Sequence, residues 1–183
     1  MKNLNPTLWR TCRTLAGTVR IRLLRLVLEN PAAGVSRLAK AAGIGQSDAS
    51  QELRRLQSRG LLKRVRAGRL VLFRPVPDPQ VSSATPLLKS LKTALANQPS
   101  QEDETLIRLA MGLAHETRIK IARELQNGPR RSAPLARTLR LAPNTLHRHL
   151  QRLKAGGWVH QESGWLLFDP PRHPVARTLT KLL

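Results

Sequence analysis

Two matching stretches of sequence decide the fold: QSDASQELRRLQSRGL at residues 46–61 and PNTLHRHLQRLKAGGW at residues 143–158. Each has aliphatic residues at its fourth, eighth and eleventh positions, namely Ala49, Leu53 and Leu56 in the first and Leu146, Leu150 and Leu153 in the second. Four-then-three spacing places such residues on one face of a helix. Each stretch then reaches a glycine, Gly60 or Gly157, the residue type that most readily closes a helix. We therefore predict two equivalent helices, each with one face turned towards a core.

The match extends over most of both halves of the chain. It begins at Arg20-Ile21, which align with Arg118-Ile119, and it continues past the glycines, where Leu72-Phe73 aligns with Leu167-Phe168. The offset is 98 residues at Arg20 and 97 residues from Leu38 to Gly60, so one residue is gapped in a loop within this stretch. A repeat of this length predicts two similar small domains instead of one large domain. We place them at residues 1–97 and 102–183, with residues 98–101 as the linker.

Both copies predict the same order of elements. In the first we expect helices over 5–16, 19–29, 36–42, 46–59 and 86–95, and strands over 61–65 and 70–74. In the second we expect helices over 102–114, 116–127, 132–139, 143–155 and 174–183, and strands over 158–162 and 165–168. A short helix, a tight turn, a longer helix and a hairpin behind them are the parts of a winged helix-turn-helix. The expected fold class is therefore mainly α with small β-hairpins (α+β), built from two tandem winged helix-turn-helix domains.

The outward face of the longer helix is the candidate DNA-reading surface. The short helix and the turn hold this helix where the major groove of B-form DNA can admit it, and side chains of its first turns reach base edges. The candidates in the first copy are Gln46, Ser47, Asp48, Ser50, Gln51 and Arg54, and those in the second are Asn144, Thr145, His147 and Arg148. Ordinary solvated helices also carry polar faces. The repeat, the paired turns and the positive charge favour DNA reading here.

Asp48 is the one acidic candidate. A carboxylate near phosphates is repelled, but it can accept a hydrogen bond from the amino group of cytosine. It can equally stabilise the positive N-terminal end of its helix. The second interpretation is the stronger one for an acid in this position, and the sequence leaves both open.

The two predicted hairpins differ in charge. The first carries Lys63, Arg64, Arg66 and Arg69, which suit the gripping of phosphates or entry into a minor groove, although basic loops also occur as plain solvated surface. The second, at residues 159–165, carries one acid and no Lys or Arg. If both copies bind DNA, the first is expected to supply more of the salt-sensitive affinity.

The overall charge points to a polyanion as partner. The 183-residue chain has 32 Lys and Arg against 11 Asp and Glu, a formal net charge of +21, and its pI is about 11.9. Such a balance favours nucleic acid first and an anionic membrane surface second. Residues 1–98 hold eighteen of the basic and four of the acidic side chains, so the first half attracts phosphate more strongly.

Other classes of function find little support in the residues. The single Cys12 rules out an internal disulfide and a cysteine-based metal site. His147 and His149 lie two apart on a helix and do not share a face, so we expect no metal and no cofactor. No apolar run approaches the roughly 18 residues of a membrane span. Neither a nucleophile with its base nor a phosphate-cradling glycine loop is present, so we expect no enzyme.

Two segments resemble a known family. LAHETRIKI at residues 113–121 resembles the opening of ArsR-type winged-helix repressors, and TLHRHLQRLKAGGWV at residues 145–159 resembles their recognition helix and its glycine end. Residues 46–62 resemble the same recognition helix and glycine end. Many relatives sense metals through two cysteines in the third helix, but residues 35–40 and 132–137 contain no such ligands. We therefore do not expect this chain to sense metals as those relatives do.

The resemblance also implies how the two halves associate. Family members usually carry one domain per chain and dimerise through their first and last helices. The two halves here would then form an intramolecular pseudo-dimer through the helices at 5–16, 86–95, 102–114 and 174–183. These leucine-bearing helices serve either such an interface, including self-association with a second chain, or packing within each domain. The sequence leaves both open.

The leading functional hypothesis is a bacterial-type, cytoplasmic and nucleoid-associated DNA-binding regulator of transcription, most simply a repressor. Its two unlike recognition helices would read two unlike half-sites of double-stranded DNA. A plasmid-type replication or partition initiator with two winged helices is the first alternative. A nucleoid or RNA-binding protein driven by charge alone is the second, and it predicts no preference between sequences at matched salt.

Overall fold

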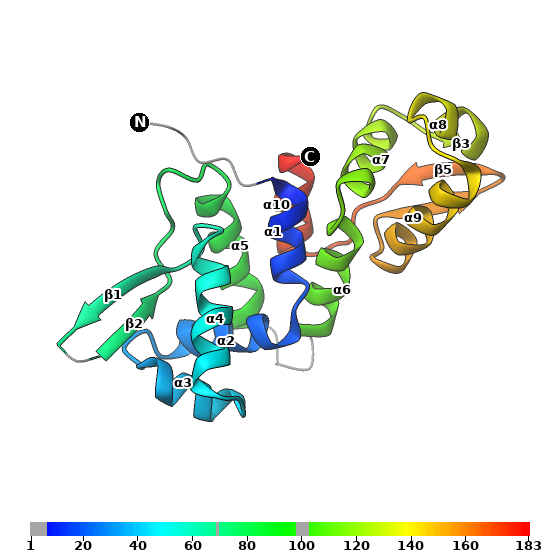
Figure 1. The fold of residues 1–183 in the computed structure, drawn as a ribbon. Coiled ribbons are helices and arrows are strands. Elements are labelled where there is room, and N and C mark those ends of the chain that lie inside the picture. The colour runs from blue at the N-terminus through cyan, green and yellow to red at the C-terminus, as the bar shows by residue number, and fades with distance from the viewer. Residues whose placement is uncertain (1–6, 69, 98–102) are drawn as a thin grey trace. The chain divides into compact units, whose positions relative to one another are not determined.

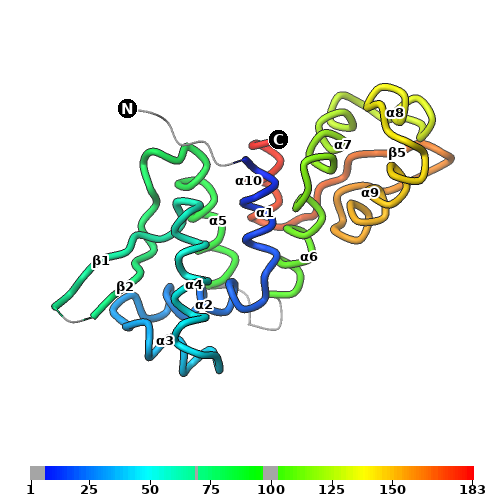
Figure 2. Tube along the Cα trace, in the orientation of Figure 1, coloured from blue at the N-terminus to red at the C-terminus, as the bar shows by residue number. Residues whose placement is uncertain are grey.

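The computed structural model describes residues 7–68, 70–97 and 103–183, and the chain divides into two compact units (Figures 1 and 2). The first unit includes Gly17–Glu104, and the second includes Leu8–Ala16 and Thr105–Leu183. Each unit consists mainly of helices and has one small antiparallel sheet. The mainly helical α+β class predicted from the sequence is therefore confirmed. The predicted linker 98–101 lies outside the described residues.

The first unit contains helices and strands in the predicted order and ends with one long helix. Its elements are α2 (Thr18–Glu29), α3 (Val35–Ala42), α4 (Gln46–Gln57), β1 (Lys63–Ala67), β2 (Leu70–Arg74) and α5 (Ala84–Asn97). Helices α2, α3 and α4 contact one another, and β2 contacts α2 and α3. The two strands pair antiparallel from Lys63 opposite Arg74 to Ala67 opposite Leu70. The far end of this hairpin extends away from the helices of its unit (Figure 1).

The second unit has the same succession of elements and three additions, α1, α6 and β3. Its elements are α1 (Leu8–Leu15), α6 (Asp103–Leu113), α7 (Glu116–Gln126), β3 (Arg130–Arg131), α8 (Ser132–Thr138), α9 (Pro143–Ala155), β4 (Val159–Glu162), β5 (Trp165–Phe168) and α10 (Pro174–Leu182). The sheet has three strands in the order β3-β5-β4, and both pairings are antiparallel. The sequence does not predict strand β3.

Helix α1 groups with the second unit, which differs from the predicted boundary at residue 97. Its buried residues are Thr11, Cys12 and Leu15, and the helix contacts α7. The apolar face of a helix shows that the helix is buried on one side, but not which element covers that side. The sequence therefore locates this helix without revealing which unit it joins.

The ends of α4 and α9 are closed in the same way in both units. Gly60 and Gly157 have φ of +72° and +74°, a left-handed backbone that favours glycine. The next residue in each case turns its N–H back to the helix: Leu61 donates to the Leu56 carbonyl at 3.2 Å, and Trp158 donates to the Leu153 carbonyl at 2.9 Å. Leu61 is fully buried as part of this closure. Strand β1 therefore begins at residue 63, not at residue 61 as predicted.

The core of the second unit includes a close contact between two glycines. A side-chain carbon at Gly112 of α6 would lie 2.6 Å from Trp158, and one at Gly156 would lie 2.8 Å from the Gly112 Cα. The indole of Trp158 is fully buried, and its N–H donates to the Leu109 carbonyl at 2.7 Å. Because both residues lack a side chain, α6 can lie directly against the end of α9. The Trp158 indole packs against the two glycines.

Candidate nucleic-acid interface

In the second unit, α8 and α9 are joined by a tight turn with an unusual residue. Arg140 has a φ of +52°, although it is not a glycine, and Leu141 donates its N–H to the Ala136 carbonyl at 2.9 Å. At the aligned place in the first unit, Gly43 has a φ of +68° and Ile44 donates to the Ala39 carbonyl at 3.1 Å. The backbone hydrogen bond is the same in both units, so the turn holds α8 to α9 as it holds α3 to α4.

Helix α9 buries one face and presents the other. Leu146, Leu150 and Leu153 are the buried residues of the helix. The predicted base-reading residues Asn144, His147 and Arg148 are exposed, and Thr145 is half-buried. The structure therefore brings all four to the accessible side of the helix within its first two turns.

Gln151 joins this surface and is absent from the set predicted from the sequence. Its amide Nε2 lies 2.9 Å from Nε2 of His147, one helical turn earlier. An amide nitrogen can only donate, so the imidazole nitrogen is the acceptor in this contact. The pair places two hydrogen-bonding side chains side by side on the exposed face of α9. The i, i+4 spacing of the two residues is the signal in the sequence that could have found it.

Helix α4 of the first unit has the same division of faces. Ala49, Leu53 and Leu56 are its buried residues. The predicted residues Gln46, Ser47, Asp48, Gln51 and Arg54 are exposed, and Ser50 is half-buried. Asp48 lies in the first turn, which carries no side-chain cap. A carboxylate there is stabilised by the helix dipole, and its exposure also leaves it accessible to a base.

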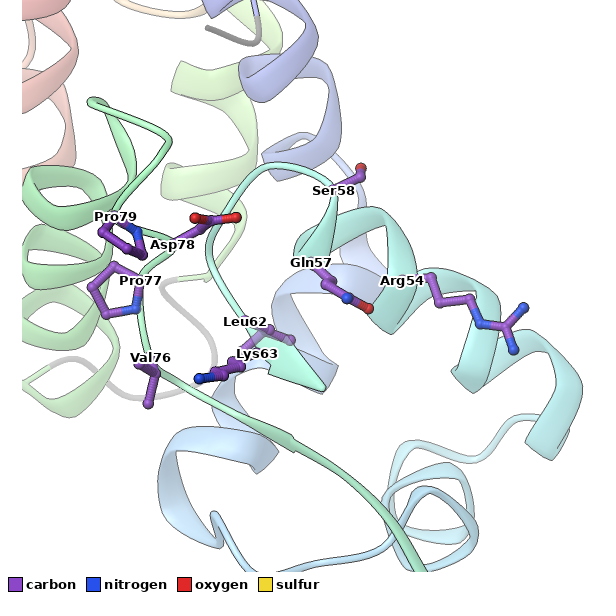
Figure 3. A pocket seen from close by; sticks show the side chains of 9 residues that line it. All are labelled: Arg54, Gln57, Ser58, Leu62, Lys63, Val76, Pro77, Asp78 and Pro79. Atoms are coloured by element: carbon purple, nitrogen blue, oxygen red, sulfur yellow. The ribbon is translucent and has the colours of Figure 1, made fainter. Parts of the chain in front are cut away.

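The hollow beside the last turn of α4 is lined partly by this surface. It has a volume of about 590 Å³ and is lined by Arg54, Gln57, Ser58, Leu62, Lys63, Val76, Pro77, Asp78 and Pro79. Figure 3 shows Arg54 extending away from the other lining side chains. The Arg54 side chain can therefore contact a molecule bound along α4. Lys63, the first residue of β1, also lines the hollow, so the hollow extends to the start of the hairpin.

The hairpin β1–β2 exposes most of its predicted cations. Lys63, Arg64 and Arg66 are all exposed, and none takes part in an ion pair or side-chain hydrogen bond within the part of the chain that the structure describes. Arg69, the fourth predicted member, lies outside the described residues. Three uncompensated cations on a protruding hairpin make a surface suited to phosphate.

The surroundings of the second hairpin are more basic than its own sequence indicates. Strand β3 lies beside β5, with Arg130 opposite Leu166 and Arg131 opposite Trp165. Both arginines are exposed, and the Arg131 guanidinium carbon lies 5.1 Å from the centre of the Trp165 ring. Trp165 is 43% exposed. A segment from before α8 thus supplies two cations to a hairpin that has none of its own between residues 159 and 165.

A histidine of α9 contacts the histidine that caps the N-terminus of α7. The rings of His149 and His115 have their centres 4.7 Å apart. Burial lowers the pKa of His149 below its ordinary value, and the nearby His115, Arg118 and Arg148 lower it further. At the aligned position of the first unit, Glu52 forms an ion pair with Arg20 at 2.7 Å. The second unit thus has a histidine where the first has a carboxylate.

The buried thiol and the grouping of possible metal ligands complete the description of the titratable groups. Burial raises the pKa of the Cys12 thiol to about 12, so it stays protonated and unreactive. Within the described ranges, no three or more His, Cys, Asp or Glu side chains are grouped so that they could hold a metal ion. None of the helices in those ranges combines the length and the hydrophobicity that crossing a bilayer requires.

Comparison with known proteins identifies one part of the chain. Residues 113–162, which run from the end of α6 to β4, match the family model of a helix-turn-helix domain. No curated protein and no solved structure matched the chain. The matched residues include the α8–turn–α9 segment and every outward residue of α9 described above. The chain therefore contains a helix-turn-helix domain at residues 113–162, a domain type that typically binds DNA.

Proposed function

We propose that this chain is a sequence-specific regulator of transcription that binds double-stranded DNA and acts as a repressor in the bacterial cytoplasm. The observation that carries the proposal is α9. Its leucines are buried, its polar residues are exposed, and it lies inside the helix-turn-helix match. A helix presented in this way fits the major groove with its first two turns. Binding, not catalysis, is the proposed activity.

A second DNA-reading head in the first unit is the further part of the proposal. Three observations support it: the repeat in the sequence, the shared turn and helix closure, and the exposed polar face of α4. The two heads are not equivalent. Asn144, His147 and Arg148 on α9 differ in chemistry from Ser47, Ser50 and Gln51 on α4, so the heads would read different sequences. We also propose that both heads are of the ArsR type, which their sequences resemble.

Selection of bound sites from random double-stranded DNA tests the proposal. The wild-type chain is expected to select two unlike blocks of conserved bases. Arg148→Ala should relax the preference in one block and Gln51→Ala in the other, because each truncation removes a base contact of about 1–3 kcal/mol. Lys120→Ala, on the exposed side of α7, is the control and should leave both blocks unchanged.

The alternatives predict other outcomes of the same selection. A protein driven by charge alone would select no sequence at matched salt. Equal losses of affinity for selected and random DNA in both variants would show that Arg148 and Gln51 do not read bases. An initiator would also select a sequence, and it is distinguished by melting of the selected duplex, which a repressor does not cause.

A further inference from the structure

A hollow in the second unit is lined by cations and has no acidic side chain. It has a volume of about 580 Å³ and lies where the chain leaves β5 and enters α10. Its lining residues are Pro170, Pro171, Arg172, Arg177, Thr180 and Lys181. This volume is within the range of pockets that bind small molecules.

The three cations of this hollow are uncompensated. Arg172, Arg177 and Lys181 are exposed, and none takes part in an ion pair or a side-chain hydrogen bond with any other described residue. Arg177 and Lys181 lie four residues apart on α10, so their like charges face each other and destabilise the helix. An anion bound between them would turn this repulsion into attraction.

Three other hollows among the described residues lack this property. The hollow beside α4 contains Asp78 together with Arg54 and Lys63 (Figure 3). A second, beside α2, contains Glu29 together with Arg25 and Lys92, and a third, at the second hairpin, contains Glu162. The net charge of +21 alone would have placed cations in any hollow. What distinguishes the hollow at α10 from these three is a set of three cations without a carboxylate side chain.

The walls of the hollow define the ligand further. The rings of Pro170 and Pro171 supply an apolar side, and the cations supply the charged side. Pro171 lies close to Gly157, because a side-chain carbon at Gly157 would come within 3.1 Å of the Pro171 Cγ. Two proline rings and three cations around one hollow suit a molecule with an apolar body and two acidic groups.

We propose that the hollow at α10 binds a small organic anion of this class, with Arg172, Arg177 and Lys181 holding its acidic groups and the two prolines contacting its body. The proposal does not depend on whether the chain binds DNA. Because Pro171 packs on Gly157, immediately after α9, the bound anion would lie beside the end of the candidate recognition helix.

Calorimetric titration of the full chain with isophthalate, an aromatic ring with two carboxylates, tests the site. The titrations are run at fixed ionic strength, with the uncharged isophthalamide as the matched probe. Wild-type protein should bind isophthalate saturably at one site and should not bind the diamide. Arg177→Gln with Lys181→Gln should weaken binding by about tenfold or more, as expected for the loss of two charge-assisted hydrogen bonds.

A second variant separates a built site from diffuse attraction. Arg37→Gln with Lys40→Gln removes the same charge from exposed positions of α3 and should bind isophthalate like the wild type. All substituted side chains are exposed, and unchanged tryptophan fluorescence confirms that the second unit is folded, since Trp9, Trp158 and Trp165 all belong to it.

Three results would overturn the proposal. Equal weakening in both double variants would show that net charge alone attracts the anion. The absence of a saturable heat with isophthalate would show that there is no site for this class. A reduced salt dependence of DNA binding in the Arg177→Gln, Lys181→Gln variant, without isophthalate binding to the wild type, would assign these cations to DNA phosphates instead.

Discussion

At the scale of single residues, the two units differ most clearly at one aligned position on their long helices. Glu52 in α4 is largely buried and pairs with Arg20 at 2.7 Å and with Arg55 at 2.5 Å. The aligned residue of α9 is His149, and the residue aligned with Arg20 is Arg118. Burial lowers the pKa of Arg118 below its ordinary value, and the charge of Arg152 lowers it further. The second unit therefore keeps the cation of this pair and lacks its anion.

Replacing His149 by glutamate should restore the missing ion pair. The carboxylate of a His149→Glu variant would lie beside Arg118 as Glu52 lies beside Arg20, and we expect the second unit to gain about 1 kcal/mol in free energy of unfolding at neutral pH. Thermal unfolding followed by tryptophan fluorescence measures this change, because all three tryptophans belong to the second unit. His149→Gln is the control, since it removes the imidazole without adding a charge.

The same histidine should make the second unit sensitive to acid. In the folded protein the pKa of His149 lies below its ordinary value of 6.5, because of burial and the nearby His115, Arg118 and Arg148. The unfolded chain thus binds the proton more readily, so stability falls as the pH drops from about 6.5 through the folded pKa. The fluorescence-detected melting temperature should fall over this window in the wild type and fall less in His149→Gln. Equal slopes in both proteins would show that another group is responsible.

At the scale of elements, the contact between α6 and the end of α9 depends on two glycines. A methyl group at Gly112 would lie 2.6 Å from Cδ1 and 2.9 Å from Nε1 of Trp158. The indole cannot move away without losing its hydrogen bond to the Leu109 carbonyl. Gly112→Ala should therefore destabilise the second unit by about 1–3 kcal/mol, in spite of the better helix propensity of alanine.

Fluorescence-detected unfolding measures the effect of Gly112→Ala. Its neighbour Met111 is 43% exposed, and Met111→Ala serves as the matched control with an expected change of less than about 0.5 kcal/mol. A Gly112→Ala variant as stable as the wild type would mean that α6 does not lie as close to α9 as the structure places it.

The two hairpins should contribute similarly to the salt dependence of DNA binding. The sequence of the second hairpin alone predicts a weak contribution, but β3 adds Arg130 and Arg131 beside β5. Arg64→Ala with Arg66→Ala should lower the slope of log affinity against log salt by about two units, and so should Arg130→Ala with Arg131→Ala, because each phosphate that a cation neutralises adds about 0.9 unit. Titrations of selected and random DNA at several salt concentrations measure both slopes. An unchanged slope in the second variant would mean that the first hairpin dominates, as the sequence alone predicts.

The elements differ in how far their sequence reveals them. Helices α4 and α9 agree with their predicted bounds to within two residues, because the apolar spacing and the closing glycines point to the same ends. Strand β3 escapes prediction because two arginines after Pro129 carry no periodicity, and only the neighbouring β5 makes them a strand. The pairing of His149 with His115 escapes it for a similar reason, since it joins α9 to the residue that caps α7. Local patterns predict faces and ends of elements, and contacts between distant segments need the fold.

At the scale of the whole molecule, the proposed two heads should bind one DNA site more tightly than either head alone. Once one head is bound, the other searches a small volume at an effective concentration of the order of mM, and the combined affinity exceeds a single head's by about 10²–10⁴ if both can be engaged together. This expectation needs only the covalent connection between the heads.

Affinity for two DNA duplexes of equal length measures this gain. One duplex carries both selected blocks, and the other has the block read by α9 scrambled. The wild type should prefer the two-block duplex by about a hundredfold or more at the same salt. In Arg148→Ala the preference should shrink towards that of a single head, because the α9 head then adds little base-specific affinity and keeps mainly its phosphate contacts. A wild-type chain that binds both duplexes equally would have only one reading head, and the first unit would then need a role other than sequence recognition.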